Sequence, residues 1–202
     1  MKSAFLYVLI AAGILLGSST STARDKPVKN ASPLSVDEVS IYNAVLRHYS
    51  NEKDVALNVS QNTYPLDPSS PLSGLQDAEC LKGIHLENIA SVSRSFHELP
   101  ADVLPGNKMK LVDPEKQAAI VRSNDPGKTT GKNKSVTAAV QSAFSTALFS
   151  MSEIAFDKER QFAVVSYRFW CGSLCGNGST LVFEKVKGEW RKANRNCGAW
   201  IS

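Results

Sequence analysis

The chain has 202 residues, of which 43% are hydrophobic and 21% charged, and its formal net charge at pH 7 is +4. That length suits a single domain with a proper hydrophobic core. The basic residues are spread along the chain. Their one cluster, Lys128, Lys132 and Lys134, has no interleaved aromatic residue, so it predicts a solvated loop and excludes a nucleic-acid partner.

The first 23 residues are typical of a secretory signal peptide. Lys2 supplies a short positive region, and an uncharged apolar run follows from Phe5 to Gly17. That run is shorter than the roughly 20 residues of a membrane-spanning helix, and small residues, including Ser21 and Ala23, follow it. We therefore expect cleavage after Ala23 and a periplasmic or secreted protein that is not embedded in the membrane. The alternative is an uncleaved N-terminal anchor.

The mature chain is expected to begin with a flexible leader over residues 24–34, because this stretch is polar and has no periodicity. A single domain is expected over residues 35–202. Ser35 and Glu38 fit a capping box, in which Ser35 caps the helix start and the side chain of Glu38 reaches back to Ser35. Apolar residues at helical spacing then predict a helix over residues 36–50.

The middle of the chain is expected to mix short strands and helices. Residues 55–59 alternate apolar and polar side chains and indicate a strand, whereas residues 75–99 have mostly helical spacing. A brief strand at 110–112 precedes Asp113, which is followed by proline in the pattern of a capped helix start. Another helix is expected over residues 136–149.

Near residue 149 the apolar period changes from 3.6 residues towards 2, which indicates strands. Strands are expected near Phe156, over residues 162–170 and 180–186, and, after a tight turn, from Trp190, with a last short pairing at Trp200. Helices thus precede strands along the chain. This order predicts an α+β fold in which N-terminal helices pack on one face of a C-terminal antiparallel β-meander.

The four cysteines are Cys80, Cys171, Cys175 and Cys197. In an oxidising compartment an even number of cysteines indicates disulfides. Cys171 and Cys175 share one loop and can close on each other, which leaves Cys80 to pair with Cys197. We favour this pairing, but the two pairings that tie Cys80 and Cys197 separately to the loop stay open.

Residues 171–178 read C-G-S-L-C-G-N-G between two expected strands. Further motif residues are Phe156-Asp157, Ala163-Val164-Val165, Glu184-Lys185, Gly188-Glu189-Trp190 and Trp200-Ile201-Ser202. On these residues the C-terminal third resembles a family of uncharacterised exported bacterial proteins. The resemblance implies a bacterial origin, export and a hairpin with a cysteine-clipped loop, but no activity. Cys80, Cys197 and the loop near Lys128 depart from the family, so it does not imply the second bridge.

No motif in the sequence predicts a catalytic residue, a metal site or a cofactor. His48, His85 and His97 lack the i, i+4 spacing of a helical zinc site. A rigid loop flanked by aromatic residues favours a non-enzymatic binding module, expected to be a monomer, for an unknown protein or small ligand. The expected contact residues are Trp170, Leu174, Tyr167, Arg168, Trp190 and Arg191.

Two other classes of function remain. A hydrolase acting on an envelope polymer would need two carboxylates, or a histidine and a nucleophile, in one cleft. Its candidates are Glu98, Asp102, Glu184 and the three histidines. Thiol redox chemistry at Cys171 and Cys175 is disfavoured, because C-x-x-x-C is not the redox motif C-x-x-C and no βαβ pattern precedes it.

Overall fold

The structure is a computed structural model that describes residues 26–53, 56–70, 73, 75, 79–130, 135–195 and 197–202. The predicted signal peptide and its cleavage site at Ala23 lie outside these residues. No helix in the described part of the chain is long and apolar enough to cross a membrane.

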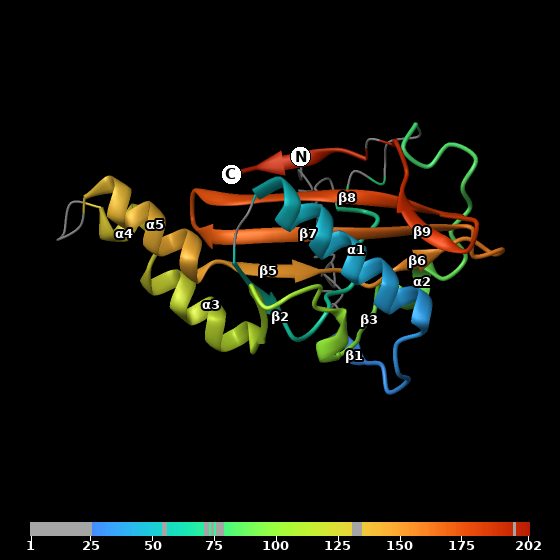
Figure 1. Cartoon of the computed structure of the whole chain (residues 1–202), viewed down its shortest axis with the longest axis horizontal. Coiled ribbons are helices and arrows are strands. Elements are labelled where there is room, and N and C mark those ends of the chain that lie inside the picture. Colours follow the sequence, from blue (N-terminus) through green and yellow to red (C-terminus); the bar gives the residue numbers. More distant parts are fainter. Residues whose placement is uncertain are drawn as a thin grey trace, which may run out of the picture.

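One mixed sheet runs through the molecule (Figure 1). Its strands are β2 (Leu57–Ser60), β4 (Met109–Val112), β5 (Leu148–Met151), β6 (Ala155–Phe156), β7 (Phe162–Gly172), β8 (Cys175–Val186), β9 (Glu189–Lys192) and β10 (Ala199–Ile201). The order across the sheet is β10-β8-β7-β5-β2-β4, while β6 pairs with β7 and β9 pairs with β8. β2 lies parallel to β4 and β5, and the other pairings are antiparallel.

The mixed α and β content agrees with the prediction. The sheet, however, is not the expected C-terminal antiparallel meander with N-terminal helices on one face. β2 and β4 come from the first 112 residues and add to the sheet in parallel. Only α1 (Val36–Lys53) among the longer helices lies along the sheet (Figure 1). α4 (Pro126–Thr129) and α5 (Val136–Thr146) lie beyond the turn that joins β7 to β8, and α3 (Pro114–Ser123) packs beside α5 and against the ends of β5 and β7 (Figure 1).

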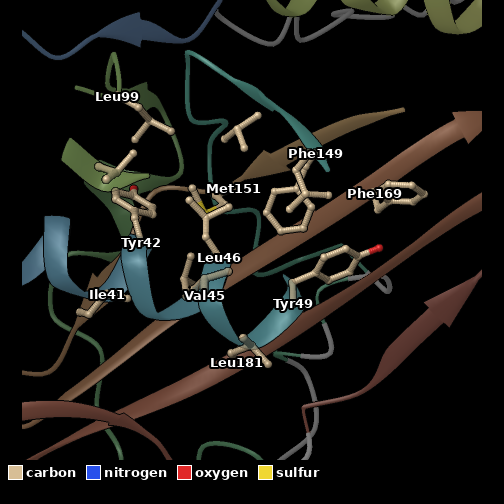
Figure 2. Close-up of a cluster of buried hydrophobic side chains, with 14 of the residues drawn as sticks. Ile41, Tyr42, Val45, Leu46, Tyr49, Leu99, Phe149, Met151, Phe169 and Leu181 are labelled. Atoms are coloured by element: carbon tan, nitrogen blue, oxygen red, sulfur yellow. The ribbon is translucent and has the colours of Figure 1, made fainter. Parts of the chain in front are cut away.

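The predicted first helix is confirmed as α1, and its capping box is formed. The Ser35 amide donates to Glu38 Oε2 at 2.7 Å, and the Glu38 amide donates to Ser35 Oγ at 3.3 Å. Figure 2 shows the buried face of α1, which points its apolar side chains at the sheet. The labelled helix residues are Ile41, Tyr42, Val45, Leu46 and Tyr49. Burying a large apolar side chain contributes about 1.5–3 kcal/mol, so this face anchors α1.

A second hydrophobic core covers the other face of the sheet. Successive residues of a strand point to opposite faces, so Val164 of β7 and Val182 of β8 enter this core, whereas Ala163 and Phe183 enter the core beneath α1. The second core includes the disulfide between Cys80 and Cys197, whose Cα atoms are 4.8 Å apart. The bridge therefore ties the irregular middle of the chain to the segment after β9.

The helical prediction for residues 75–99 is wrong. Among the described residues of that segment, helix is confined to α2 (Ile89–Val92), and β3 (Ser95–Phe96) follows it. The apolar side chains do reach the second core, but from an irregular backbone. Other strands and loops supply the backbone partners that a helix would have provided: the Glu87 amide donates to Phe156 O at 3.0 Å, and the Leu66 amide donates to Val92 O at 3.0 Å.

The remaining predicted elements are largely present. Strands occur at β2 and β4, and α3 begins after Asp113, whose side chain accepts hydrogen bonds from two amides of the first turn. The helix expected over 136–149 ends at Thr146, because the chain then joins the sheet as β5 between β2 and β7. Within the expected leader, β1 (Val28–Lys29) pairs in parallel with β3.

Candidate functional site

The expected loop at residues 171–178 is mostly strand. β7 continues through Gly172 and β8 begins at Cys175, so only Ser173 and Leu174 form the turn. The Cys171–Cys175 disulfide closes this turn, with the two Cα atoms 5.0 Å apart, and the strand register shifts between Trp170 and Gly172. We call residues 171–175 the hairpin tip. The structure therefore contains both bridges of the favoured pairing, Cys171–Cys175 here and Cys80–Cys197 in the second core.

Asp125 binds the hairpin tip to the start of α4. The carboxylate is only 4% exposed, and it accepts hydrogen bonds from the Ser173 amide at 3.1 Å, the Ser173 hydroxyl at 3.2 Å and the Gly127 amide at 3.0 Å. Burial alone would raise the pKa of Asp125. The hydrogen bonds from Ser173 and Gly127, together with the positive charge of Lys128, instead hold the pKa below its ordinary value.

Gly172 permits this close contact. Its φ of +145° is one that residues with a side chain rarely adopt, and a Cβ atom there would lie 2.9 Å from Pro126 Cδ and 3.0 Å from Asp125 Oδ1. The hairpin tip is thus fixed by a covalent bridge, a buried carboxylate and a tight backbone contact. It is a rigid structure at one end of the sheet.

Several large apolar side chains are exposed at this end. Leu174 at the hairpin tip is 83% exposed. Val136, Val140 and Phe144 are also exposed, and their i, i+4, i+8 spacing places them on one face of α5. The Phe144 ring packs 5.6 Å from the ring of Phe169 in β7, which joins this face of α5 to the sheet. We call Leu174 with the three α5 residues the apolar end.

The residues expected to form a ligand contact lie in different places. Trp170 is near the hairpin tip, with the Arg122 guanidinium 5.8 Å from its ring centroid. Tyr167 and Arg168, as neighbours on one strand, face opposite sides of the sheet. Tyr167 packs under α1, whereas the guanidinium of Arg168 lies 4.1 Å from the Tyr64 ring centroid.

Trp190 and Arg191 lie at the other end of β8, far from the hairpin tip. Trp190 Nε1 donates to Asp37 Oδ1 at 2.9 Å, Lys185 Nζ lies 2.9 Å from the same oxygen, and Arg191 pairs with Glu189. Burial alone would raise the pKa of Asp37, but these two hydrogen bonds lower it below its ordinary value. The six expected residues therefore do not form one surface, and only Leu174 and Trp170 remain at the hairpin tip.

The residues expected for a hydrolase are also dispersed, with one exception. Glu184 lies in β8 beside β9, and Asp102 lies in the short 3-10 helix η2 (Ala101–Val103). His85 is exposed in an irregular segment, and His48 belongs to α1. His97 and Glu98, however, line one cavity of about 420 Å³ together with residues 29–34.

His97 belongs to a buried polar network that the sequence analysis missed. Its Nδ1 lies 2.8 Å from Glu153 Oε2, and its backbone amide donates to Glu153 Oε1 at 2.9 Å. The Thr63 hydroxyl also donates to Glu153 Oε1. His97 is 6% exposed and Glu153 is 2% exposed. The available signal was a single acidic residue, Glu153, inside the otherwise uncharged run from 148 to 156.

A second cavity of about 450 Å³ lies beside the same network. Thr63 lines it, and apolar rings supply much of its wall: Pro27, Tyr64, Pro65, Phe96 and Pro114. Residues just before β1 line this cavity, whereas β1 and the residues after it line the His97 cavity. The Thr63–Glu153–His97 network thus connects two cavities of the size that small ligands occupy.

Comparisons with protein-family models, with curated proteins and with solved structures find no match for this chain. Within the described residues, no group of three or more His, Cys, Asp or Glu side chains is placed to hold a metal ion.

Proposed function

We propose that this protein is an exported interaction module that binds a partner protein through the apolar end. The observation that carries the proposal is Leu174, a large apolar side chain that is 83% exposed on a rigid turn. The exposed apolar face of α5 lies at the same end of the sheet, and exposed apolar patches are typical of interaction sites. A rigid hairpin tip also loses little conformational entropy on binding, so more of the contact energy appears as affinity.

The surroundings of the apolar end indicate the kind of partner. Arg122 of α3 and Lys128 of α4 are exposed beside it, and the one buried carboxylate here, Asp125, points inward to the hairpin tip. A partner with an apolar patch rimmed by acidic residues would complement this surface in both shape and charge. No catalytic step at the hairpin tip is part of this proposal.

The proposal is tested by site-specific photo-crosslinking in the native cells. A photoreactive residue replaces Leu174 or, as the matched control, Lys158, which is exposed in the β6–β7 turn at the opposite end of the sheet. We expect a discrete adduct from position 174 and none from position 158. The adduct from a photoreactive residue at Val140 should disappear when Leu174→Asp is added, because a charge then enters the apolar contact.

Two outcomes would contradict the proposal. One is equal crosslinking from positions 174 and 158, which would show that contact with the apolar end is not specific. The other is an adduct from position 140 that persists in the Leu174→Asp variant. Leu174 is exposed, so its replacement should leave the unfolding midpoint within a few degrees of the parent and the test does not depend on altered folding.

A further inference from the structure

The His97–Glu153 pair has the geometry of a base held in place by a carboxylate. Both oxygens of Glu153 accept hydrogen bonds, from His97 Nδ1, from the His97 amide and from Thr63. A carboxylate that accepts from Nδ1 fixes the proton on that nitrogen and leaves the lone pair of a neutral imidazole on Nε2. Nε2 has no hydrogen-bond partner among the described residues, and His97 lines the 420 Å³ cavity.

The other side chains of this cavity supply hydrogen-bond donors. Asn30 Oδ1 accepts the Ser32 amide hydrogen at 3.0 Å, so the amide NH2 of Asn30 is left without a partner among the described residues. Ser32, whose side chain carries a hydroxyl donor, lines the same cavity. A base and uncharged donors in one cavity are the groups that a carbonyl substrate needs, since donors stabilise the oxyanion that forms when a nucleophile attacks.

The charges at the rim of the cavity cancel. Lys29 Nζ and Glu98 Oε2 are 2.6 Å apart, and the ammonium group lowers the pKa of Glu98, which keeps that carboxylate ionised. The rim therefore carries no net charge. An uncharged ligand suits it better than an anion or a cation.

We propose that His97 is the general base of a hydrolytic site for small uncharged carboxylic esters, with Glu153 as its positioning residue. Nε2 takes a proton from a water molecule, whose oxygen forms a bond to the acyl carbon. The bond from that carbon to the leaving oxygen then breaks, and Nε2 returns the proton to the leaving alkoxide. One ester and one water become an acid and an alcohol, and the imidazole ends neutral. Glu153 holds the Nδ1 hydrogen bond throughout and stabilises the transient imidazolium.

The test uses p-nitrophenyl acetate and the whole mature chain with both disulfides intact. We expect saturable hydrolysis that stops when diethyl pyrocarbonate modifies His97 and returns after hydroxylamine treatment. Mass spectrometry locates the modified residue. This part needs no variant, so it does not depend on whether a substitution folds. Hydrolysis that is not saturable, or that survives modification of His97, would overturn the proposal.

Variants separate catalysis from a structural role of the network. His97→Asn should lower kcat by about 100-fold, the size typical of a lost general base. Glu153→Gln should lower kcat and leave KM unchanged, whereas a merely structural role would change both together or neither. His85→Asn is the matched control, because His85 is exposed and does not line the cavity, and it should retain the parent rate. An unchanged kcat in a folded His97→Asn variant would also refute the proposal.

This activity is independent of the apolar end. Leu174→Asp should abolish the adduct from position 140 and leave ester hydrolysis at the parent rate. His97→Asn should slow ester hydrolysis and leave that adduct unchanged. The two proposals therefore fail separately.

Discussion

The two disulfides should differ in their effect on stability, although each joins two cysteines by the same chemistry. Cys80 and Cys197 are separated by 117 positions, and Cys171 and Cys175 by 4. A disulfide stabilises a protein mainly by restricting the unfolded chain, and the restriction grows with the logarithm of the loop that it closes. Replacing Cys80 and Cys197 together with alanine should thus cost more than replacing Cys171 and Cys175.

The loop lengths set the expected magnitudes. The chain-entropy relation assigns about 5 kcal/mol to the long bridge and about 2 kcal/mol to the short one at 25 °C. For a chain of this length, 1 kcal/mol corresponds to about 2–4 °C in melting temperature, so we expect losses of about 10–20 °C and about 4–8 °C respectively. Cys80 and Cys197 are buried in the second core and Cys171 in the first, so replacing either pair also removes packing, and the difference between the variants depends on the loop lengths.

Urea titrations followed by circular dichroism, on the two double-alanine variants and the parent, measure this difference directly. The midpoints should decrease in the order parent, short-bridge variant, long-bridge variant. The slope of the transition should also rise in the long-bridge variant, since its unfolded chain exposes more surface. Equal losses, or a larger loss for the short bridge, would refute the entropic reasoning.

Three further changes test local contacts. Gly172→Ala should lower the free energy of unfolding by about 1–3 kcal/mol, measured in urea, because the new methyl group meets Pro126 and the φ of the residue is unfavourable; an unchanged midpoint would show that the hairpin tip can relax. Asp37→Asn should lower the free energy of unfolding by about 1–3 kcal/mol, measured by thermal unfolding, because it weakens the charged hydrogen bond from Trp190. An unchanged melting temperature would show that this bond does not stabilise the fold. The folded-state pKa values of Asp37 and Asp125 lie below the ordinary 3.8, so their stabilisation should be complete above that pH and lost as the pH falls through the folded values. Urea midpoints that stay constant from pH 5 to pH 2.5 would contradict this linkage.

The elements that could be predicted from the sequence have local causes. The helix α1 follows from a capping box and an apolar stripe, and α3 follows from Asp113 and the proline after it. The tight turn between β8 and β9 is encoded by Lys187-Gly188, whose φ angles of 52° and 85° are both positive. In each case neighbouring residues supply the capping, spacing or turn chemistry.

The elements that could not be predicted depend on distant partners. Residues 75–99 have helical spacing, but Cys197 and the backbone of β6 hold this segment in an irregular form. The parallel position of β2 between β4 and β5 also has no local signal, because parallel pairing joins segments that are far apart along the chain. Local propensity is overridden wherever such tertiary contacts supply better backbone partners.

The candidate site was predictable only in part, for the same reason. The short bridge and the exposed Leu174 follow from the spacing of residues 171–178, whereas Asp125 reaches the hairpin tip across 48 positions of sequence. The His97–Glu153 pair joins residues that are 56 positions apart. A sequence pattern shows each of these residues, but not that the fold brings them together.

The order of the cysteines along the chain has a consequence for oxidative folding. In a chain exported from its N-terminus, as the signal-peptide prediction implies, Cys80 emerges first and meets Cys171 and Cys175 before Cys197. Either encounter could form a wrong bridge that must later be exchanged by slow thiol–disulfide chemistry. Cys171 and Cys175 are close along the chain and form a hairpin with each other, so they can oxidise together soon after they emerge. The short bridge then removes both competing thiols and leaves Cys197 as the remaining partner for Cys80.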